Sequence, residues 1–318
     1  MRWNIIDGHQ DIAMALLEDE GWDFGGPACE GHALSLADAK AGRVVLILGT
    51  IFATNGYWKD ATPAESAEKQ MTLYDDLLGR HADDLFRVES RGDLRLCQPG
   101  GPIGLVHLME GADPIRSPRD LKRWARRGVR VVGPAWNTGN RYCGGWDDAR
   151  GLTADGKRLV AEMRANRVIP DVSHLKPDAF DDVFACDDGL IVASHSNAHA
   201  VHPHRRNLTD DQIRAVAERD GIVGIVLYNP FIGEGEVTVD TVLDHVEHMV
   251  GLVGPDHVGL GSDLDGGFKP SDAPQGIDSV ADLRRIGEGL AARGLDDGAI
   301  GKILGGNWMR VLTRALPE

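Results

Sequence analysis

The segment Ile103-Gly104-Leu105-Val106-His107-Leu108-Met109-Glu110 is a short apolar run that ends in an acidic residue. Continuous apolar runs of this length are typical of strands that are buried on both faces, as in parallel sheets. Seven further runs rich in apolar residues have the same character, and they lie at Trp3–Ile6, Val44–Ile51, Val129–Pro134, Val168–Val172, Leu190–Ala193, Ile222–Leu227 and Val258–Leu260. We therefore predict eight buried parallel strands.

Segments with the residue spacing of helices separate these strands. Thr209 and Gln212 resemble a capping box that opens one helix, and Thr153 precedes another. Helices are expected at residues 63–78, 117–127, 153–166, 209–219, 240–253, 279–293 and 296–316. Strands that alternate with helices indicate a barrel or a doubly wound sheet, and no glycine-rich phosphate-binding motif follows the first strand. Without a repeat or a linker, the sequence predicts one (β/α)8 (TIM) barrel domain over residues 1–318.

The charge and the cysteine content exclude several classes of protein. The formal net charge of −15 disfavours a nucleic-acid partner, because phosphate binding requires a basic face. No signal peptide, lipidation motif or membrane-spanning apolar run is found, so we expect a cytoplasmic protein that does not bind a membrane. Cys29, Cys97, Cys143 and Cys186 form no CxxC pair and are expected to be reduced thiols.

Polar residues occur where the predicted strands end. In (β/α)8 enzymes the active site lies at the carboxyl ends of the strands and takes residues from several of them. Potential metal ligands or acid/base groups follow five of the eight strands, and they are His9, Asp11, Glu110, His174, His195 and Asp263. Packing does not explain so many polar residues at one end of a barrel, so we predict a metal-dependent hydrolase.

The types of these residues favour two metal ions. His9 and Asp11 are two residues apart, which places both side chains on the same side of an extended strand. These two residues could hold one ion, whereas His174 and His195 from adjacent strands could hold another, with Glu110 between the ions. Imidazole and carboxylate ligands suit Zn²⁺, and Mn²⁺, Co²⁺ or Fe²⁺ also fit. Two divalent ions would also lower the pKa of a bridging water and so provide a hydroxide nucleophile.

Several motifs carry a resemblance that extends over the whole chain. In sequence order they are Asp7-Gly8-His9-Gln10-Asp11, Met109-Glu110-Gly111, Asp171-Val172-Ser173-His174, Ser194-His195-Ser196, Arg205-Arg206-Asn207 and Gly261-Ser262-Asp263-Leu264-Asp265-Gly266. Their order and spacing resemble those of the membrane dipeptidase (renal dipeptidase) family of zinc metallopeptidases. The resemblance implies a small dipeptide substrate, with L-Xaa-D-Xaa dipeptides within the expected range, and a homodimer.

The resemblance also implies a role for each residue of the site. His9 and Asp11 would bind one zinc ion, His174 and His195 would bind the other, and Glu110 would bridge them. Asp263 would lie beside the bridging water as proton acceptor and donor. Arg206 would bind the terminal carboxylate of the substrate, and a guanidinium group suits this role because it forms two parallel hydrogen bonds.

One residue departs from the pattern of the family. The dipeptidases usually have a histidine after the fourth strand, in a Thr-His-x-x-Asn motif, where it contacts the substrate. Trp136 takes this position here and Asn137 follows it. An indole has one N–H donor and cannot become a cation. Trp136 or Asn137 could replace the hydrogen bond of the histidine, or Trp136 could shape the pocket for another substrate.

Two alternative functions therefore stay open. The same site could hydrolyse another amide or an ester, such as an N-acyl amino acid or a lactone, which is the reading that Trp136 motivates. A metal-binding protein without catalysis is the other alternative. The presence of Asp263 opposes it, because a purely structural ion needs no acid/base group beside it.

Overall fold

The computed structural model describes residues 3–26 and 31–318 and contains a parallel sheet that is rolled into a barrel. Its strands pair in the order β6-β5-β4-β2-β1-β8-β7, and β3 pairs with β4 outside this path. The strands are β1 (Ile5–Gln10), β2 (Val44–Phe52), β3 (Leu85–Arg87), β4 (Ile103–Glu110), β5 (Val129–Val132), β6 (Ile169–Pro170), β7 (Val223–Ile225) and β8 (Val258–Leu260).

The predicted strand at Leu190–Ala193 is reduced to isolated bridges, yet these bridges close the barrel. Val192 pairs with Asp171 after β6, and Ala193 pairs with Val223 of β7, both in parallel orientation. The Ala193 amide donates to the carbonyl of Ile222 at 2.9 Å. The segment therefore occupies the eighth strand position of the barrel, between β6 and β7, and the predicted (β/α)8 barrel is confirmed. The short β3 strand was not predicted.

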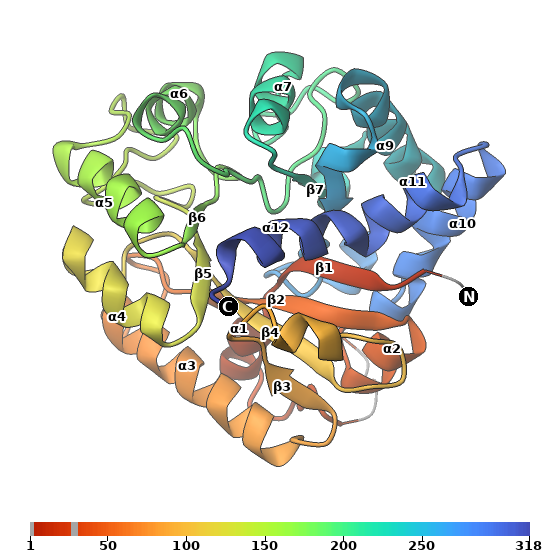
Figure 1. The fold of residues 1–318 in the computed structure, drawn as a ribbon, viewed down its shortest axis with the longest axis horizontal. Coiled ribbons are helices and arrows are strands. Elements are labelled where there is room, and N and C mark those ends of the chain that lie inside the picture. The colour runs from red at the N-terminus through yellow and green to blue at the C-terminus, as the bar shows by residue number, and fades with distance from the viewer. Residues whose placement is uncertain (1–2, 27–30) are drawn as a thin grey trace.

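Helices surround the barrel (Figure 1), and their caps follow the sequence. Thr209 and Gln212 form the expected capping box of α7, and Thr153 caps α5. No helix was predicted at α1, α2, α6 or α8, of which all but the ten-residue α6 have seven residues or fewer. The helices are α1 (Ile12–Glu18), α2 (Leu36–Ala41), α3 (Pro63–Arg80), α4 (Leu121–Arg126), α5 (Ala154–Ala165), α6 (Pro177–Cys186), α7 (Asp210–Glu218), α8 (Asn229–Ile232), α9 (Val239–Val253), α10 (Arg284–Ala292), α11 (Asp297–Gly301) and α12 (Asn307–Ala315).

The last predicted helix is broken, and its final part, α12, closes the amino-terminal end of the barrel. A π-helical turn at Lys302–Gly306 separates α11 from α12, which lies across the centre of Figure 1 in dark blue. The indole of Trp308 donates to the carbonyl of Leu260 at 2.7 Å. A Cβ atom on Gly8 would lie 2.2 Å from the ring of Trp308, so only glycine fits there. This packing joins α12 to the apolar interior of the barrel.

Three of the four cysteines lie in the part of the chain that the structure describes. Cys97 and Cys143 are buried free thiols, Cys186 is an exposed one, and Cys29 lies outside the described residues. No helix within residues 3–26 and 31–318 combines the length and the apolar character that crossing a bilayer requires.

His107 of β4 makes the stability of the fold sensitive to acid. The side chain is fully buried, and burial together with the positive charges of Arg87, Arg127 and Arg130 lowers its pKa to about 3. Below pH ~6.5 His107 is therefore protonated in the unfolded chain but stays neutral in the folded chain. The residue destabilises the fold increasingly as the pH falls toward 3.

We expect His107→Gln to reduce this acid sensitivity. Between pH 7 and pH 5 the wild type should lose about 2 kcal/mol more of its unfolding free energy than the variant, because each pH unit below the unfolded pKa contributes about 1.4 kcal/mol. Urea denaturation at the two pH values measures the difference. Equal losses in the two proteins would contradict the prediction.

Candidate metal centre

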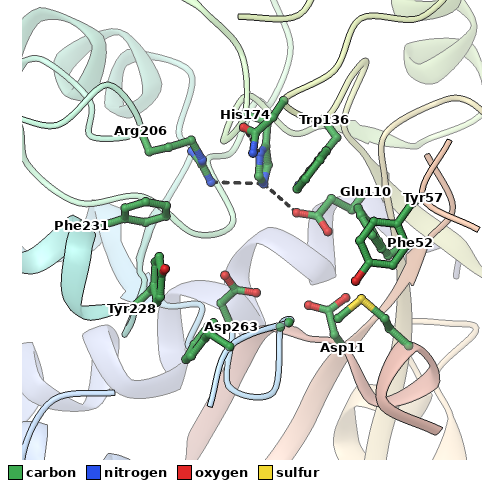
Figure 2. A pocket seen from close by; sticks show the side chains of 15 residues that line it. Asp11, Phe52, Tyr57, Glu110, Trp136, His174, Arg206, Tyr228, Phe231 and Asp263 are labelled. Atoms are coloured by element: carbon green, nitrogen blue, oxygen red, sulfur yellow. Dashed lines mark hydrogen bonds and ion pairs between the residues drawn. The ribbon is translucent and has the colours of Figure 1, made fainter. Parts of the chain in front are cut away.

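The predicted site residues meet at the carboxyl ends of the strands. His9 and Glu110 lie at the ends of β1 and β4, and Asp11 directly precedes α1 without a side-chain capping hydrogen bond. Nε2 of His174 lies 2.6 Å from Oε1 of Glu110, and Nε2 of His195 lies 3.4 Å from the same oxygen. Figure 2 shows Asp11, Glu110, His174 and Asp263 around one cavity. The barrel thus brings together residues that are far apart in the sequence.

Three groups of side chains have the spacing to hold a cation, and two of them include residues that line the cavity. One group consists of Glu110, His174 and His195, and the other of His9, Asp11 and Asp263, each with ligand atoms within 4.8 Å of one another. Nε2 of His9 lies 3.7 Å from Oε1 of Glu110, so the two groups adjoin. Asp263 was predicted only as an acid/base group, but its Oδ1 atom lies 3.7 Å from Nε2 of His9 and so lies within the second group.

The polar atoms of the site are better arranged to coordinate divalent cations than to form hydrogen bonds with one another. Nε2 of His9 and Oδ1 of Asp11 are buried and have no hydrogen-bond partner among the described residues. Nε2 of His174 and Nε2 of His195 are only 2.7 Å apart, so at most one of them can carry a hydrogen. Imidazole nitrogens and carboxylate oxygens with unused lone pairs are ligands that Zn²⁺ accepts.

The electrostatic effects of burial point in the same direction. Burial raises the pKa of the Asp263 carboxyl well above its usual range, and the negative charges of Asp11 and Glu110 raise it further. Burial lowers the pKa of His195 far below its usual range, with a contribution from His9, and burial beside Arg206 lowers that of His174 to about 4. Both imidazoles are therefore neutral at pH 7 and can offer a lone pair.

One hydroxyl group orients two of the three histidines. Ser194 Oγ donates to Oδ2 of Asp171 at 2.5 Å, so its only hydrogen is used. The Nδ1 atoms of His195 and His9 lie 2.8 Å and 3.3 Å from the same oxygen and must be the donors. Both rings then carry their hydrogen on Nδ1 and direct the Nε2 lone pair into the site. Ser194 and Asp171 lie in motifs that carry the family resemblance, but no role was predicted for either residue.

Asp171 is close enough to His9 and His195 to form a third group of possible ligands. Its carboxylate, however, already accepts hydrogen bonds from the amides and hydroxyls of Ser173 and Ser194. With its lone pairs used in this way, Asp171 supports the ligands and is poorly placed to be one. Asp171 holds Ser194, and Ser194 in turn accepts from the Nδ1 atoms of His9 and His195. Hydrogen bonds of this kind to the outer nitrogen of a ligand histidine are common at metal sites and fix the orientation of the ring.

We expect Ser194→Ala to lower the affinity for a divalent metal about 10- to 100-fold, because two imidazoles lose the acceptor that orients them. Competition with a chromogenic chelator measures this affinity without any substrate. Ser196→Ala is the matched control, since Ser196 Oγ is buried two residues away and makes no hydrogen bond with the described residues. An equal affinity of the Ser194 and Ser196 variants would contradict the prediction.

Asn137 and Trp136 have different surroundings, although both were predicted to bind substrate. Oδ1 of Asn137 accepts a hydrogen bond from Nδ1 of His174 at 3.0 Å, so Asn137 orients the third histidine. Trp136 is half-buried, and its ring lies 5.2 Å from that of Phe52 and 5.9 Å from that of His174. Its indole N–H has no hydrogen bond to a described residue. Asn137 and Trp136 both line the cavity, so contact with a substrate stays a prediction for each.

Arg206 lies at the edge of the same cavity. It is buried, its Nη1 atom donates to the carbonyl of Ser173, and its Nη2 atom donates to Nε2 of His174 at 3.1 Å (Figure 2). That nitrogen of His174 is the one that would bind a metal. Nη2 also donates to the carbonyl of His195 at 3.4 Å, so metal binding to His174 would free its second N–H for another acceptor, such as a carboxylate oxygen.

Two aspartates outside the ligand set shape the loops of the site. Asp113 accepts hydrogen bonds from Asn55 at 2.6 Å and from Asn140 at 2.8 Å, and so connects the loops that follow β2, β4 and β5. Asp265 has a left-handed backbone with φ 60°, as Asp263 has, but its carboxylate accepts from the amides of Ala33 and Leu34. These residues position the chain around the cavity, which has a volume of about 270 Å³.

The whole chain is similar in sequence to several known proteins. The profile of a family described as membrane dipeptidase (peptidase family M19) matches residues 1–316. An uncharacterized protein in the pqqA 5′ region of Klebsiella pneumoniae is 34% identical over 264 residues, which is 79% of this chain and 96% of that protein. The dipeptidase aclJ of Aspergillus oryzae is 36% identical over 254 residues, which is 77% of this chain but only 60% of the fungal protein.

Solved structures extend the comparison to the fold. A metallo peptidase from Rhodobacter sphaeroides, liganded with a phosphinate mimic of the dipeptide L-Ala-D-Ala, has a TM-score of 0.89 and 29% identity, with 98% of this chain and 99% of that chain covered. A structure described as dipeptidase AC, a metallo peptidase of family M19, has a TM-score of 0.88 and 30% identity, with 100% of both chains covered.

Proposed function

Since the chain belongs to the membrane dipeptidase family of metallopeptidases, we propose that it hydrolyses the amide bond of dipeptides at a site for two divalent cations. The observation that carries the proposal is the convergence of three imidazoles and three carboxylates at one end of the barrel, with unused lone pairs directed at one another. The structure of a relative is liganded with a phosphinate mimic of L-Ala-D-Ala, which supports L-Xaa-D-Xaa dipeptides as substrates in this proposal.

The side chains divide naturally between the two cations. His9 and Asp11 would hold one ion, His174 and His195 would hold the other, and Glu110 would be shared because its carboxylate faces all three imidazoles. Zinc is the metal that we propose. When bound, two such ions would polarise the scissile carbonyl and make a water molecule acidic enough to attack it at neutral pH.

Asp263 is the group that we propose moves the proton. Its Oδ1 atom lies among His9 and Asp11, and its side chain lines the cavity. The carboxylate would accept a proton from the attacking water and deliver it to the nitrogen of the leaving amine. The leaving group then departs as a neutral amine, which a peptide bond requires in order to break at neutral pH.

Arg206 would bind the terminal carboxylate of the dipeptide and so place the scissile bond over the ligands. We expect Arg206→Lys to lower kcat/KM for a dipeptide about 10- to 100-fold, because a lysine keeps the charge but not the planar fork, and hydrogen bonds between charged groups contribute about 1.5–3 kcal/mol. The same dipeptide with an amidated C-terminus is the control, because it lacks the carboxylate. A loss of equal size on both substrates would contradict this role of Arg206.

The proposed function is tested by offering a panel of L-Xaa-L-Xaa and L-Xaa-D-Xaa dipeptides to the zinc-loaded protein and to the metal-free protein. Cleavage by the loaded protein alone supports a metal-dependent dipeptidase and gives the stereochemistry of the substrate. Failure to cleave any dipeptide with two ions bound would reject the proposal. The second candidate would then be hydrolysis of an N-acyl amino acid or a lactone, which Trp136 favours because no histidine occupies that position.

A further inference from the structure

The walls of the cavity are unusually rich in aromatic rings. The chain contains seven tryptophans, four tyrosines and seven phenylalanines, and a third of these residues line this single cavity. They are Phe52, Tyr57, Trp136, Tyr228, Phe231 and Phe268. Chance would not gather so many rings around a site of about 270 Å³, so the walls need an explanation beyond the binding of metal.

The rings form two clusters on opposite sides of the ligands (Figure 2). On one side, the ring of Phe52 lies 4.7 Å from that of Tyr57 and 5.2 Å from that of Trp136. On the other side, the ring of Tyr228 lies 4.9 Å from that of Phe231 and 4.8 Å from that of Phe268. A dipeptide has one side chain on each side of its amide bond, so two apolar walls match its two side chains.

Among the residues that the structure describes, the walls offer no free charge to a charged side chain of the substrate. The charged or ionisable groups of the lining other than tyrosine are Asp11, Glu110, His174, Arg206 and Asp263, and each already has a role with the metals, the proton or the terminal carboxylate. A substrate aspartate side chain would therefore lose its water and find aromatic carbon instead, and a lysine side chain would keep only the attraction between its ammonium group and the faces of the rings. Such desolvation without a partner is costly, whereas an apolar side chain gains from the same burial.

We propose that this site selects dipeptides in which both side chains are apolar and preferably aromatic, an inference that rests on the proposed dipeptidase activity. Arg206 fixes the direction of the substrate, because it would bind the terminal carboxylate. Its guanidinium carbon lies 5.4 Å from the centre of the Phe231 ring, so the C-terminal residue is placed beside this ring. The C-terminal side chain then lies against Tyr228 and Phe231, and the N-terminal side chain lies against Phe52 and Trp136. Trp136 is thus a specificity-determining residue.

The test compares kcat/KM for Phe-Ala, Asp-Ala and Lys-Ala, which differ in the N-terminal side chain, and for Ala-Phe, Ala-Asp and Ala-Lys, which differ in the C-terminal one. Ala-Ala is the reference, and each peptide is prepared with both configurations of the second residue. We expect the phenylalanine peptides to exceed their charged counterparts by roughly 10- to 100-fold in both series. Equal values would overturn the inference while the dipeptidase activity stands, and no cleavage of any peptide, Ala-Ala included, would overturn both.

Two variants then test which aromatic cluster contacts which side chain of the dipeptide. Trp136→Ala should reduce the preference for phenylalanine in the N-terminal series alone, and Phe231→Ala should reduce it in the C-terminal series alone. Phe184→Ala is the matched control, because Phe184 stacks on Phe180 of α6 at 4.5 Å and does not line the cavity. Equal effects of a wall variant on both series would overturn the assignment. The comparison within the wild type needs no variant and holds even if one of them fails to fold.

Discussion

Replacing Asp263 with asparagine is expected to lower kcat for dipeptide hydrolysis by about 10²- to 10⁴-fold, the usual contribution of a positioned acid/base group. Asparagine has nearly the same shape as aspartate but can neither accept the proton of the attacking water nor return it to the amine. Because Asp263 also lies within ligand distance of His9 and Asp11, the metal content of the variant must be measured together with its activity.

The matched control is Asp265→Asn, two residues further along the same loop. Asp263 and Asp265 share a left-handed backbone, with φ 61° and φ 60°, but Asp265 faces the amides of Ala33 and Leu34. We expect this control to melt earlier and to keep most of its turnover. Near-full turnover of a metal-loaded Asp263 variant would reject the proton transfer, whereas loss of one ion together with activity would identify Asp263 as a ligand.

Replacing Glu110 with glutamine is expected to have the second large effect, on metal content and activity together. Glu110 Oε1 lies 2.6 Å from His174, 3.4 Å from His195 and 3.7 Å from His9, so its charge serves both candidate cation sites. Glutamine keeps the size of the side chain and removes the charge. We expect fewer than two ions per chain and a fall in kcat/KM of about 10³-fold or more, because the metals contribute several kcal/mol to catalysis.

Asp113→Asn is the control for the loss of a carboxylate at this end of the barrel. Asp113 connects neighbouring loops through Asn55 and Asn140 and is not part of either ligand group. Elemental analysis of both variants after dialysis gives the metal content. Two bound ions in the Glu110 variant would contradict a shared ligand at this position.

The sequence predicted the barrel and the set of residues at its carboxyl end for a simple physical reason. Strands buried on both faces are apolar along their whole length, so a polar residue such as Glu110 stands out where the strand ends. The carboxyl ends of parallel strands lie at the same end of the barrel. The proximity of His9 and His195 can therefore be predicted from the order of the strands alone. The family and the (β/α)8 fold that we predicted are confirmed.

Other features could not be predicted because they depend on the paths of loops. Asn137 follows Trp136 directly, but which of them would contact His174 depends on how the segment after β5 turns. The same holds for Tyr228 and Phe268, whose segments have no periodic pattern to show that they meet. Ser194 lies beside a candidate ligand in the sequence, so its role could have been suspected, yet only the structure shows that one hydroxyl serves two imidazoles.

The position of α12 has a consequence for the order in which the molecule is assembled. Trp308 completes the interior of the barrel from its amino-terminal end, but the ribosome makes this residue after every strand of the sheet. Until then the space beside Gly8 and Gly259 that the ring of Trp308 occupies is unfilled. During synthesis the strands therefore keep apolar surface exposed until Trp308 has been made. Long chains are prone to aggregate at such a stage, which is where chaperones act.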